Sequence, residues 1–269
     1  LPDISPSREE IGRHRFSKPL STPPAPSSAD NSSGAAADSV ISPLEGEMSG
    51  RTEGGNVKRL SPIGIFPLHA TFALGPGLPF GSVSADRLIA LAKKAKSLGA
   101  TEIRLAPQRA LLVLGLSETA STSLQRAAED LGFIVEANDP RGRIAACVGA
   151  PACASGYIAT RQIAENIARN TGDMLDPSFV LHVSGCAKGC AHPGTTALTL
   201  VGSEYARVGL VLSRTARDTP ATYVSSDALT QGLQRMAAAL RIERHANEPT
   251  STCLARLGKT RVAAFFQQG

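Results

Sequence analysis

The stretches ACVGAPACASG at residues 146–156 and VSGCAKGCAHP at residues 183–193 hold four of the five cysteines in this 269-residue chain. Their spacing is C-x5-C and then, after 32 intervening residues, C-x3-C. Each pair follows a short apolar segment typical of a β-strand, and each lies in a run rich in glycine and alanine. The pattern predicts two cysteine loops, each placed where a strand ends.

Four thiolates are the ligand set of a cubane [4Fe–4S] cluster, which takes one cysteine per iron. Glycines beside the cysteines let the backbone bend around a bulky inorganic core and leave N–H groups free to donate to sulfur. The predicted ligands are Cys147, Cys153, Cys186 and Cys190. The accompanying glycines are Gly149, Gly156, Gly185 and Gly189.

Zinc and redox thiols are the alternatives to a cluster. Zinc sites favour cysteine pairs separated by two to four residues, so the second pair fits zinc while the five-residue gap of the first pair is long. Free redox or structural thiols remain a third interpretation. The fifth cysteine, Cys253, lies in an apolar C-terminal segment and is interpreted as a small core residue.

Composition limits the class of protein. Aromatic residues are 4% of the chain and Trp is absent, so the core is expected to be aliphatic. The net charge of +5 is spread over scattered Lys and Arg, which argues against a nucleic-acid partner and suits a polyanionic small molecule. No run reaches the roughly 18 apolar residues of a membrane span. The first residues lack a signal-peptide pattern, so a cytoplasmic location is expected.

Four regions are predicted. Residues 1–59 are rich in Pro, Ser, Ala and Asp without an apolar periodicity, and are expected to be disordered. Residues 60–138 form the next region and residues 139–246 the cluster-binding domain. Residues 247–269 are a helical tail.

The region 60–138 has the pattern of a ferredoxin-like β-α-β-β-α-β unit. An extended segment at 63–74 precedes a helix that Ser84 caps and Gly99 ends. Alternating residues predict strands at 101–106 and 110–116, followed by a helix at 119–131 and a last strand at 133–137. The predicted fold class is α+β.

The region 139–246 is expected to be an α/β unit of the sulfite/nitrite reductase type. A short strand leads into the first cysteine pair and a helix begins just past Cys153. A strand at 179–185 leads into the second pair. Two adjacent strands, at 196–202 and 206–213, and a closing helix at 226–246 complete the unit.

The chain resembles the precorrin-3B synthase family, within the sulfite/nitrite reductase superfamily, over residues 62–265. The residues that carry the resemblance are GLPFG (77–81), EIRLAPQRALLVLGL (102–116), AACVGAPACASG (145–156) and HVSGCAKGCAHPG (182–194). It implies hydroxylation of precorrin-3A at C-20 with γ-lactone formation, using O2 and reducing equivalents. It also implies a [4Fe–4S] cluster on the four cysteines.

The resemblance further implies a second iron or sirohaem, and electrons from NAD(P)H through a donor that the sequence does not identify. The substrate-binding residues it implies are Arg104, Gln108, Arg109, Lys188 and His192. Arginines suit the carboxylates of a precorrin because a guanidinium binds a carboxylate through two hydrogen bonds. No residue is assigned as the catalytic acid or base.

Members of the superfamily contain two related halves, and this chain matches only the second. It is therefore expected to be a fragment, a split subunit that needs an N-terminal half or partner subunit, or a decayed gene product. Two other functions remain as alternative interpretations of the sequence. One is a fragment of a sirohaem-dependent sulfite or nitrite reductase, and the other is a non-catalytic iron–sulfur module for electron transfer or binding.

Overall fold

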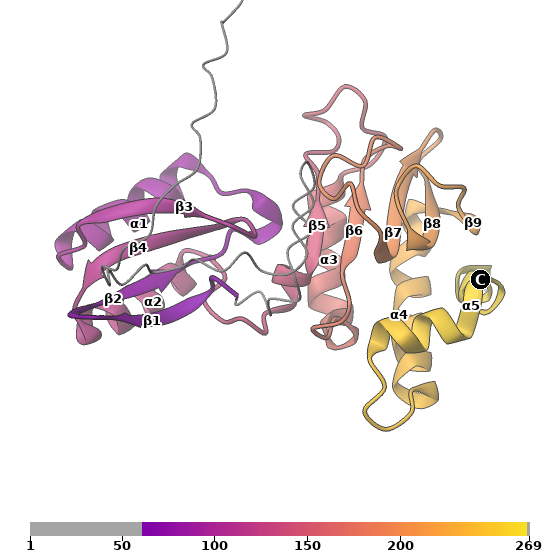
Figure 1. The fold of residues 1–269 in the computed structure, drawn as a ribbon. Helices are drawn as coiled ribbons and strands as arrows, with labels where there is room; N and C mark the ends of the chain where they lie inside the picture. The colour runs from indigo at the N-terminus through magenta and orange to yellow at the C-terminus, as the bar shows by residue number, and fades with distance from the viewer. Residues whose placement is uncertain (1–60, 268–269) are drawn as a thin grey trace, which may run out of the picture. The chain divides into compact units, whose positions relative to one another are not determined.

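The computed structural model describes residues 61–267, which form an α+β fold with two sheets and five α-helices (Figure 1). The predicted disorder of residues 1–59 lies outside the described residues. Between residues 61 and 267, no helix is long and apolar enough to cross a membrane. The strands are β1 (Gly64–Leu68), β2 (Thr71–Gly75), β3 (Glu102–Ala106), β4 (Ala110–Leu116), β5 (Ile144–Ala146), β6 (Leu181–Ser184), β7 (Thr196–Ser203), β8 (Arg207–Arg214) and β9 (Thr222–Ser225). The helices are α1 (Ala85–Ser97), α2 (Glu118–Asp130), α3 (Thr160–Thr171), α4 (Ser226–Glu243) and α5 (Thr250–Gln267).

The first sheet is antiparallel, in the order β1-β2-β4-β3, and α1 and α2 pack on it. Both helices begin at the serine that an N-cap requires: the Ser84 hydroxyl accepts from the Arg87 N–H, and the Ser117 hydroxyl accepts from the Ala120 N–H. Leu91 and Leu124 are fully buried against the sheet. The two helices that apolar periodicity predicted in this region are therefore present as α1 and α2.

Two details of this sheet differ from the prediction. The segment 63–74 is a β1–β2 hairpin rather than one extended segment. The last strand, expected at 133–137, is only a bridge in which Gly77 and Ile134 exchange N–H···O bonds of 2.8 and 2.9 Å. The bridge is not extended into a strand, because β1 already occupies the edge of β2 with which a strand at 133–137 would pair. Pro76 and Pro79, on either side of Gly77 and Leu78, also have no N–H to donate.

The second sheet has the order β5-β6-β7-β8-β9 and holds the larger core. β5, β6 and β7 are parallel neighbours, and the remaining pairs are antiparallel. The sequence analysis missed β9, in which Val224 is the one buried residue and which therefore shows little apolar pattern. The helix expected just past Cys153 begins at Thr160, because the residues before it run along the cysteine loops.

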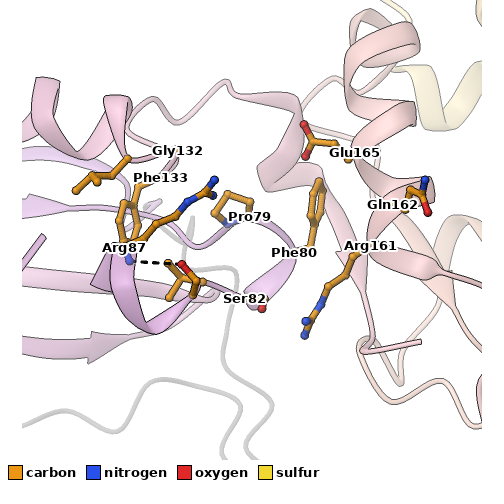
Figure 2. A pocket seen from close by; sticks show the side chains of 12 residues that line it. Pro79, Phe80, Ser82, Arg87, Gly132, Phe133, Arg161, Gln162 and Glu165 are labelled. Carbon is orange, nitrogen blue, oxygen red and sulfur yellow. Dashed lines mark hydrogen bonds between the residues drawn. The ribbon is translucent and has the colours of Figure 1, made fainter. Parts of the chain in front are cut away.

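The turn Pro79–Gly81 carries Phe80 into the core of the second sheet (Figure 2). Phe80 has a φ of 55°, a left-handed backbone that costs an L-residue about 1–2 kcal/mol. Its side chain is only 7% exposed. Burial of the aromatic ring offsets the strain and holds this turn against β5.

The predicted helical tail packs into the same core as the second sheet. Cys253, Leu254, Val262 and Phe266 of α5 are buried with residues of α4. Gly258 interrupts α5 with a non-helical φ of 75°, which allows the helix to change direction. Cys253 is fully buried, and burial raises the pKa of its thiol, as expected of a core residue rather than a reactive one.

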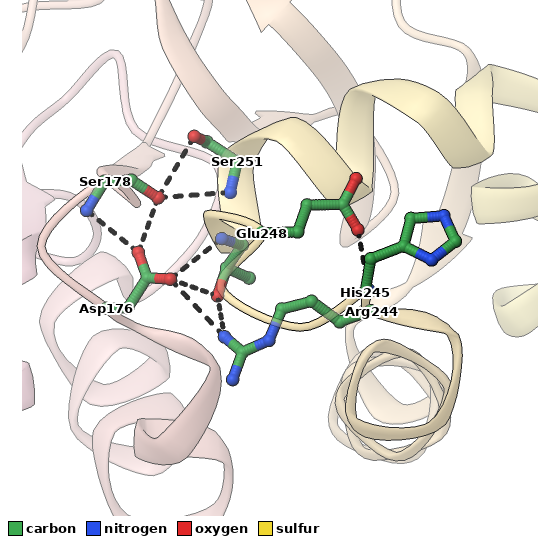
Figure 3. A network of polar contacts seen from close by, with 7 residues as sticks. Asp176, Ser178, Arg244, His245, Glu248 and Ser251 are labelled. Carbon is green, nitrogen blue, oxygen red and sulfur yellow. Dashed lines mark hydrogen bonds and ion pairs between the residues drawn. The ribbon is translucent and has the colours of Figure 1, made fainter.

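Asp176, in the loop before β6, holds the start of α5 (Figure 3). Its carboxylate accepts from the Thr250 N–H at 2.8 Å and the Thr250 hydroxyl at 2.6 Å. It also accepts from the Ser178 N–H at 2.8 Å and from the Ser178 hydroxyl. Burial opposes these bonds by raising the pKa of Asp176, but the hydrogen bonds from Ser178 and Thr250 outweigh it and lower that pKa to about 2.

Asp176→Asn is expected to lower the free energy of unfolding by about 1–3 kcal/mol at pH 7, because partly buried hydrogen bonds to a charged acceptor are weakened or lost. A depressed pKa stabilises the fold above the unfolded value near 4 and stops doing so as the pH falls toward 2. The difference between variant and parent should therefore shrink from pH 5 to pH 2 in denaturant titrations. Asp173→Asn, which breaks an exposed pair with Arg241, is the control, and an equal loss there would contradict the assignment.

Candidate functional site

The two cysteine loops leave the same edge of the second sheet. β5 and β6 are adjacent parallel strands with Ala146 opposite Val183, so their C-terminal ends lie side by side. Cys147 directly follows β5, and its N–H donates to the Val183 carbonyl over 3.3 Å. Cys186 follows β6 by two residues. The sheet therefore brings together two segments that are far apart in the sequence.

Glycines let these loops approach closely. A Cβ on Gly185 would lie 3.2 Å from the Gly156 Cα, 3.3 Å from the Gly149 Cα and 3.5 Å from the Cys147 sulfur. Gly149 also has a φ of +64°. The Gly185 N–H donates to the Cys147 sulfur over 3.1 Å, a bond that stabilises a thiolate. We call Gly149, Gly156 and Gly185 the glycine cradle.

The first loop is fixed by its own hydrogen bonds. The Cys153 N–H donates to the Gly149 carbonyl at 2.8 Å, and the Gly156 N–H donates to the Cys153 carbonyl at 2.9 Å. The Thr160 hydroxyl, at the start of α3, donates to the Cys147 carbonyl at 2.6 Å. The backbone that carries the first cysteine pair is thus held in one conformation by the sheet and by α3.

The four thiols are free, with Cys190 exposed and the other three half-buried. Within residues 61–267, no three His, Cys, Asp or Glu side chains lie close enough together to bind one metal ion. A cubane takes one thiolate per iron, whereas a zinc site takes four ligands that converge on one ion. The four cysteine thiols match the donor set of a cubane in number and kind.

Lys188 joins the two cysteine loops. Its ammonium donates to the Ser155 hydroxyl over 2.8 Å, and it lines a pocket of about 680 Å³ with Tyr157, Cys186 and Arg217. The structure places Lys188 beside the cysteines, in a different pocket from the other predicted substrate-binding residues.

A second pocket, of about 490 Å³, gathers three of those residues: Gln108, Arg109 and His192. We call it the arginine pocket. Arg141 and Arg143 also line it and were missed by the sequence analysis. Arg104 does not line it; this side chain is exposed on β3 and pairs with Glu102 at 2.6 Å.

Arg109 is a partly buried arginine in a strained turn. It lies in the β3–β4 turn, where Gln108 and Arg109 both have a φ of 60°, a left-handed conformation that costs about 1–3 kcal/mol per residue. Burial lowers the pKa of Arg109, and within residues 61–267 it forms no ion pair. A desolvated guanidinium without a carboxylate is costly, and strained residues cluster at binding sites.

Two other arginines extend the positive lining of the arginine pocket. Arg141 is fixed by Asp139, which accepts from the Arg141 Nη2 at 2.6 Å and, mainly through that hydrogen bond, raises the pKa of Arg141. Arg143 donates to the Ala137 carbonyl over 3.3 Å. Both arginines belong to the sequence DPRGR at residues 139–143, which directly precedes β5. This position, just before the strand that leads to the first cysteine pair, could have identified them from the sequence.

His182 is a buried group next to this pocket. It lies on β6 with no exposed surface, and neither ring nitrogen has a hydrogen-bond partner among the described residues. Burial, and then the charges of His192 and Arg109, lower the pKa of His182 to about 4. The His182 and His192 ring centroids are 6.0 Å apart. His182 is therefore neutral at pH 7, with a proton on one ring nitrogen only.

Comparison with known proteins supports the resemblance inferred from the sequence. No model of a known protein family matches the chain. Over 201 residues the chain is 39% identical to a curated precorrin-3B synthase from a Sinorhizobium species. This match covers 75% of the chain and 44% of the relative, so the chain spans less than half of that protein's length. The predicted resemblance is thus confirmed for that part.

Two solved structures share the fold. The Mycobacterium tuberculosis NirA protein superposes with a TM-score of 0.62 at 20% identity, covering 77% of this chain and 42% of NirA. Dissimilatory sulfite reductase I superposes with a TM-score of 0.51 at 10% identity, covering 74% of this chain and 69% of that one. At these identities the comparisons show the α+β fold alone, which agrees with the predicted fold class.

Proposed function

We propose that this chain, a relative of precorrin-3B synthase, forms the cluster-bearing half of an oxidoreductase that acts on a polycarboxylated tetrapyrrole. The observation that carries the proposal is the meeting of the two cysteine loops, with their glycine cradle, at the ends of β5 and β6. The relative's identity supports the substrate class, and the arginine pocket supplies a complementary charge.

Cys147, Cys153, Cys186 and Cys190 would hold the [4Fe–4S] cluster, which supplies single electrons when bound. The Gly185 N–H, which donates to the Cys147 sulfur, would orient this ligand toward the cluster. Lys188 places a positive charge beside the cysteines, where it offsets the charge of four thiolates. The glycine cradle keeps side chains out of the space around the first loop.

The substrate we propose is precorrin-3A, hydroxylated at C-20 and closed to a γ-lactone with O2 and reducing equivalents. Arg109 would bind a ring carboxylate by a charge-assisted hydrogen bond, helped by Gln108 in the same turn. Arg143, which has no carboxylate partner within residues 61–267, would bind a further carboxylate, while Arg141 stays paired with Asp139. His192, which lines the arginine pocket, and His182, whose ring centroid is 6.0 Å from that of His192, would be the groups able to pass a proton.

Arg109→Ala is expected to weaken binding of a polycarboxylated tetrapyrrole by tenfold or more, since it removes a charge-assisted hydrogen bond of about 1.5–3 kcal/mol. The measurement is fluorescence titration of the full chain with uroporphyrin, a stable octacarboxylate. Arg104→Ala is the matched control, because Arg104 is exposed and pairs with Glu102 outside the pocket. Equal losses in the two variants would contradict a role for the arginine pocket.

The alternatives give different outcomes in the same sample. A chain purified with sirohaem would favour a sulfite or nitrite reductase fragment. A chain that holds iron and sulfide but does not bind uroporphyrin would favour a non-catalytic iron–sulfur module. Binding by the 269-residue chain together with an iron–sulfur signal supports the proposed half-site.

A further inference from the structure

A further pocket, of about 520 Å³ and drawn in Figure 2, lies beside the arginine pocket, since Arg141 of that pocket donates to the Gly132 carbonyl over 3.1 Å. None of its lining residues lines the arginine pocket or belongs to the cysteine loops. It is bounded by the turn at Pro79, the first turn of α1, the loop after α2 and the start of α3. No predicted site residue accounts for it.

Two guanidinium groups of this pocket have no carboxylate partner. Arg161 contributes a buried Nε without a hydrogen-bond partner among the described residues. Arg87 lies against Gly132, whose Cβ, if present, would be 3.2 Å from the Arg87 Nη1. Within residues 61–267 neither side chain forms an ion pair. Arg161 is half-buried and Arg87 is exposed. Leaving the half-buried Arg161 guanidinium unpaired is costly, so an anion bound there would gain mainly from Arg161, and Arg87 would add a weaker attraction that solvent screens.

The one carboxylate of the pocket is already engaged. Glu165 pairs with Arg169 one helical turn further along α3, with N···O distances of 3.0 and 3.1 Å. It therefore offsets little of the charge that Arg87 and Arg161 bring. The pocket carries a net positive charge.

The walls of this pocket are apolar. Phe133 is 1% exposed and Phe80 is 7% exposed, and both are fixed by the cores behind them. Pro79, Val83 and Leu131 complete the apolar surface. Rigid apolar walls with a few polar groups are the usual make-up of a small-molecule site.

We propose that this pocket binds a small organic carboxylate with an apolar, ring-sized body. A guanidinium fork matches the two oxygens of a carboxylate, and the aromatic walls receive the body of the molecule. The proposal does not depend on the cluster or on the tetrapyrrole, because it uses no residue of either site.

The test is a fluorine NMR titration of the full chain with 4-fluorobenzoate and with the neutral isostere 4-fluorobenzamide. The carboxylate is expected to bind at least about tenfold more tightly than the amide, because only the carboxylate forms charge-assisted bonds. Arg161→Gln should reduce benzoate binding about tenfold. Arg207→Gln, which removes an arginine stacked on Tyr223 outside this pocket, should leave it unchanged.

Gln162→Trp keeps the test decisive if Arg161→Gln does not fold. Gln162 is exposed at the edge of the pocket, so a tryptophan there fills the opening without burying a charge. Loss of benzoate binding in Gln162→Trp supports the site. Equal affinity for the acid and the amide, no binding of benzoate, or benzoate binding that survives Gln162→Trp would overturn the proposal.

Discussion

Cys147→Ser is expected to reduce the iron content of the anaerobically purified chain from about four atoms per chain to well under half of that. The hydroxyl of serine is a much weaker ligand for iron than a thiolate, which is the form that binds metal. The fold also holds Cys147 in place, because its N–H donates to the Val183 carbonyl and its sulfur accepts from the Gly185 N–H. A reconstituted cluster in the variant would therefore lack a ligand that the fold positions.

Cys253→Ser is the matched control for that experiment. Cys253 is fully buried in the core beside α4, and the Arg256 guanidinium lies 3.4 Å from its sulfur. Its replacement should leave iron and sulfide counts at the level of the parent chain. The cluster assignment would be wrong if Cys147→Ser kept all of its iron, or if Cys253→Ser lost as much.

Gly202→Ala is expected to lower the free energy of unfolding by about 2–3 kcal/mol, the upper part of the range for overpacking. A Cβ on Gly202, in β7, would lie 2.5 Å from the Gly185 carbonyl oxygen and 2.8 Å from the Ile158 Cγ1. The nearest atom is backbone, so relief requires β6 and the second cysteine loop to move away from β7. Cluster retention should fall together with stability.

Gly142→Ala is the control for overpacking, because nothing lies within 4 Å of a Cβ placed there and its φ is not in the left-handed region. Urea titrations of both variants give the free energies of unfolding. Iron counts on the same samples show whether the second cysteine loop still retains the cluster. If Gly202→Ala were as stable as Gly142→Ala, the close packing of β7 against the Gly185 carbonyl would not limit the size of residue 202.

Much of the fold could be predicted because apolar periodicity and capping residues act locally. Ser84 and Ser117 begin helices where the sequence places them. The error at 133–137 came from competition between segments, since β1 takes the edge that a last strand would need. Local propensity does not show which of two segments pairs with an edge.

The candidate site was predictable only in part for similar reasons. Gln108, Arg109 and His192 share a pocket, whereas Arg104 lies on the exposed edge strand β3 and pairs with Glu102. The left-handed φ of Arg109 and the burial of His182 arise from packing between distant segments. Neither the φ of Arg109 nor the burial of His182 can be predicted from the apolar periodicity of the sequence.

An anaerobic iron and sulfide count of the full chain, with absorption and EPR spectra of the same sample, tests the central claim most directly. We expect about four irons and four sulfides per chain, a broad charge-transfer band and an EPR signal after reduction, as for a [4Fe–4S] cluster. Stoichiometric zinc, or four free thiols with no iron after reconstitution, would contradict the assignment of Cys147, Cys153, Cys186 and Cys190 as cluster ligands.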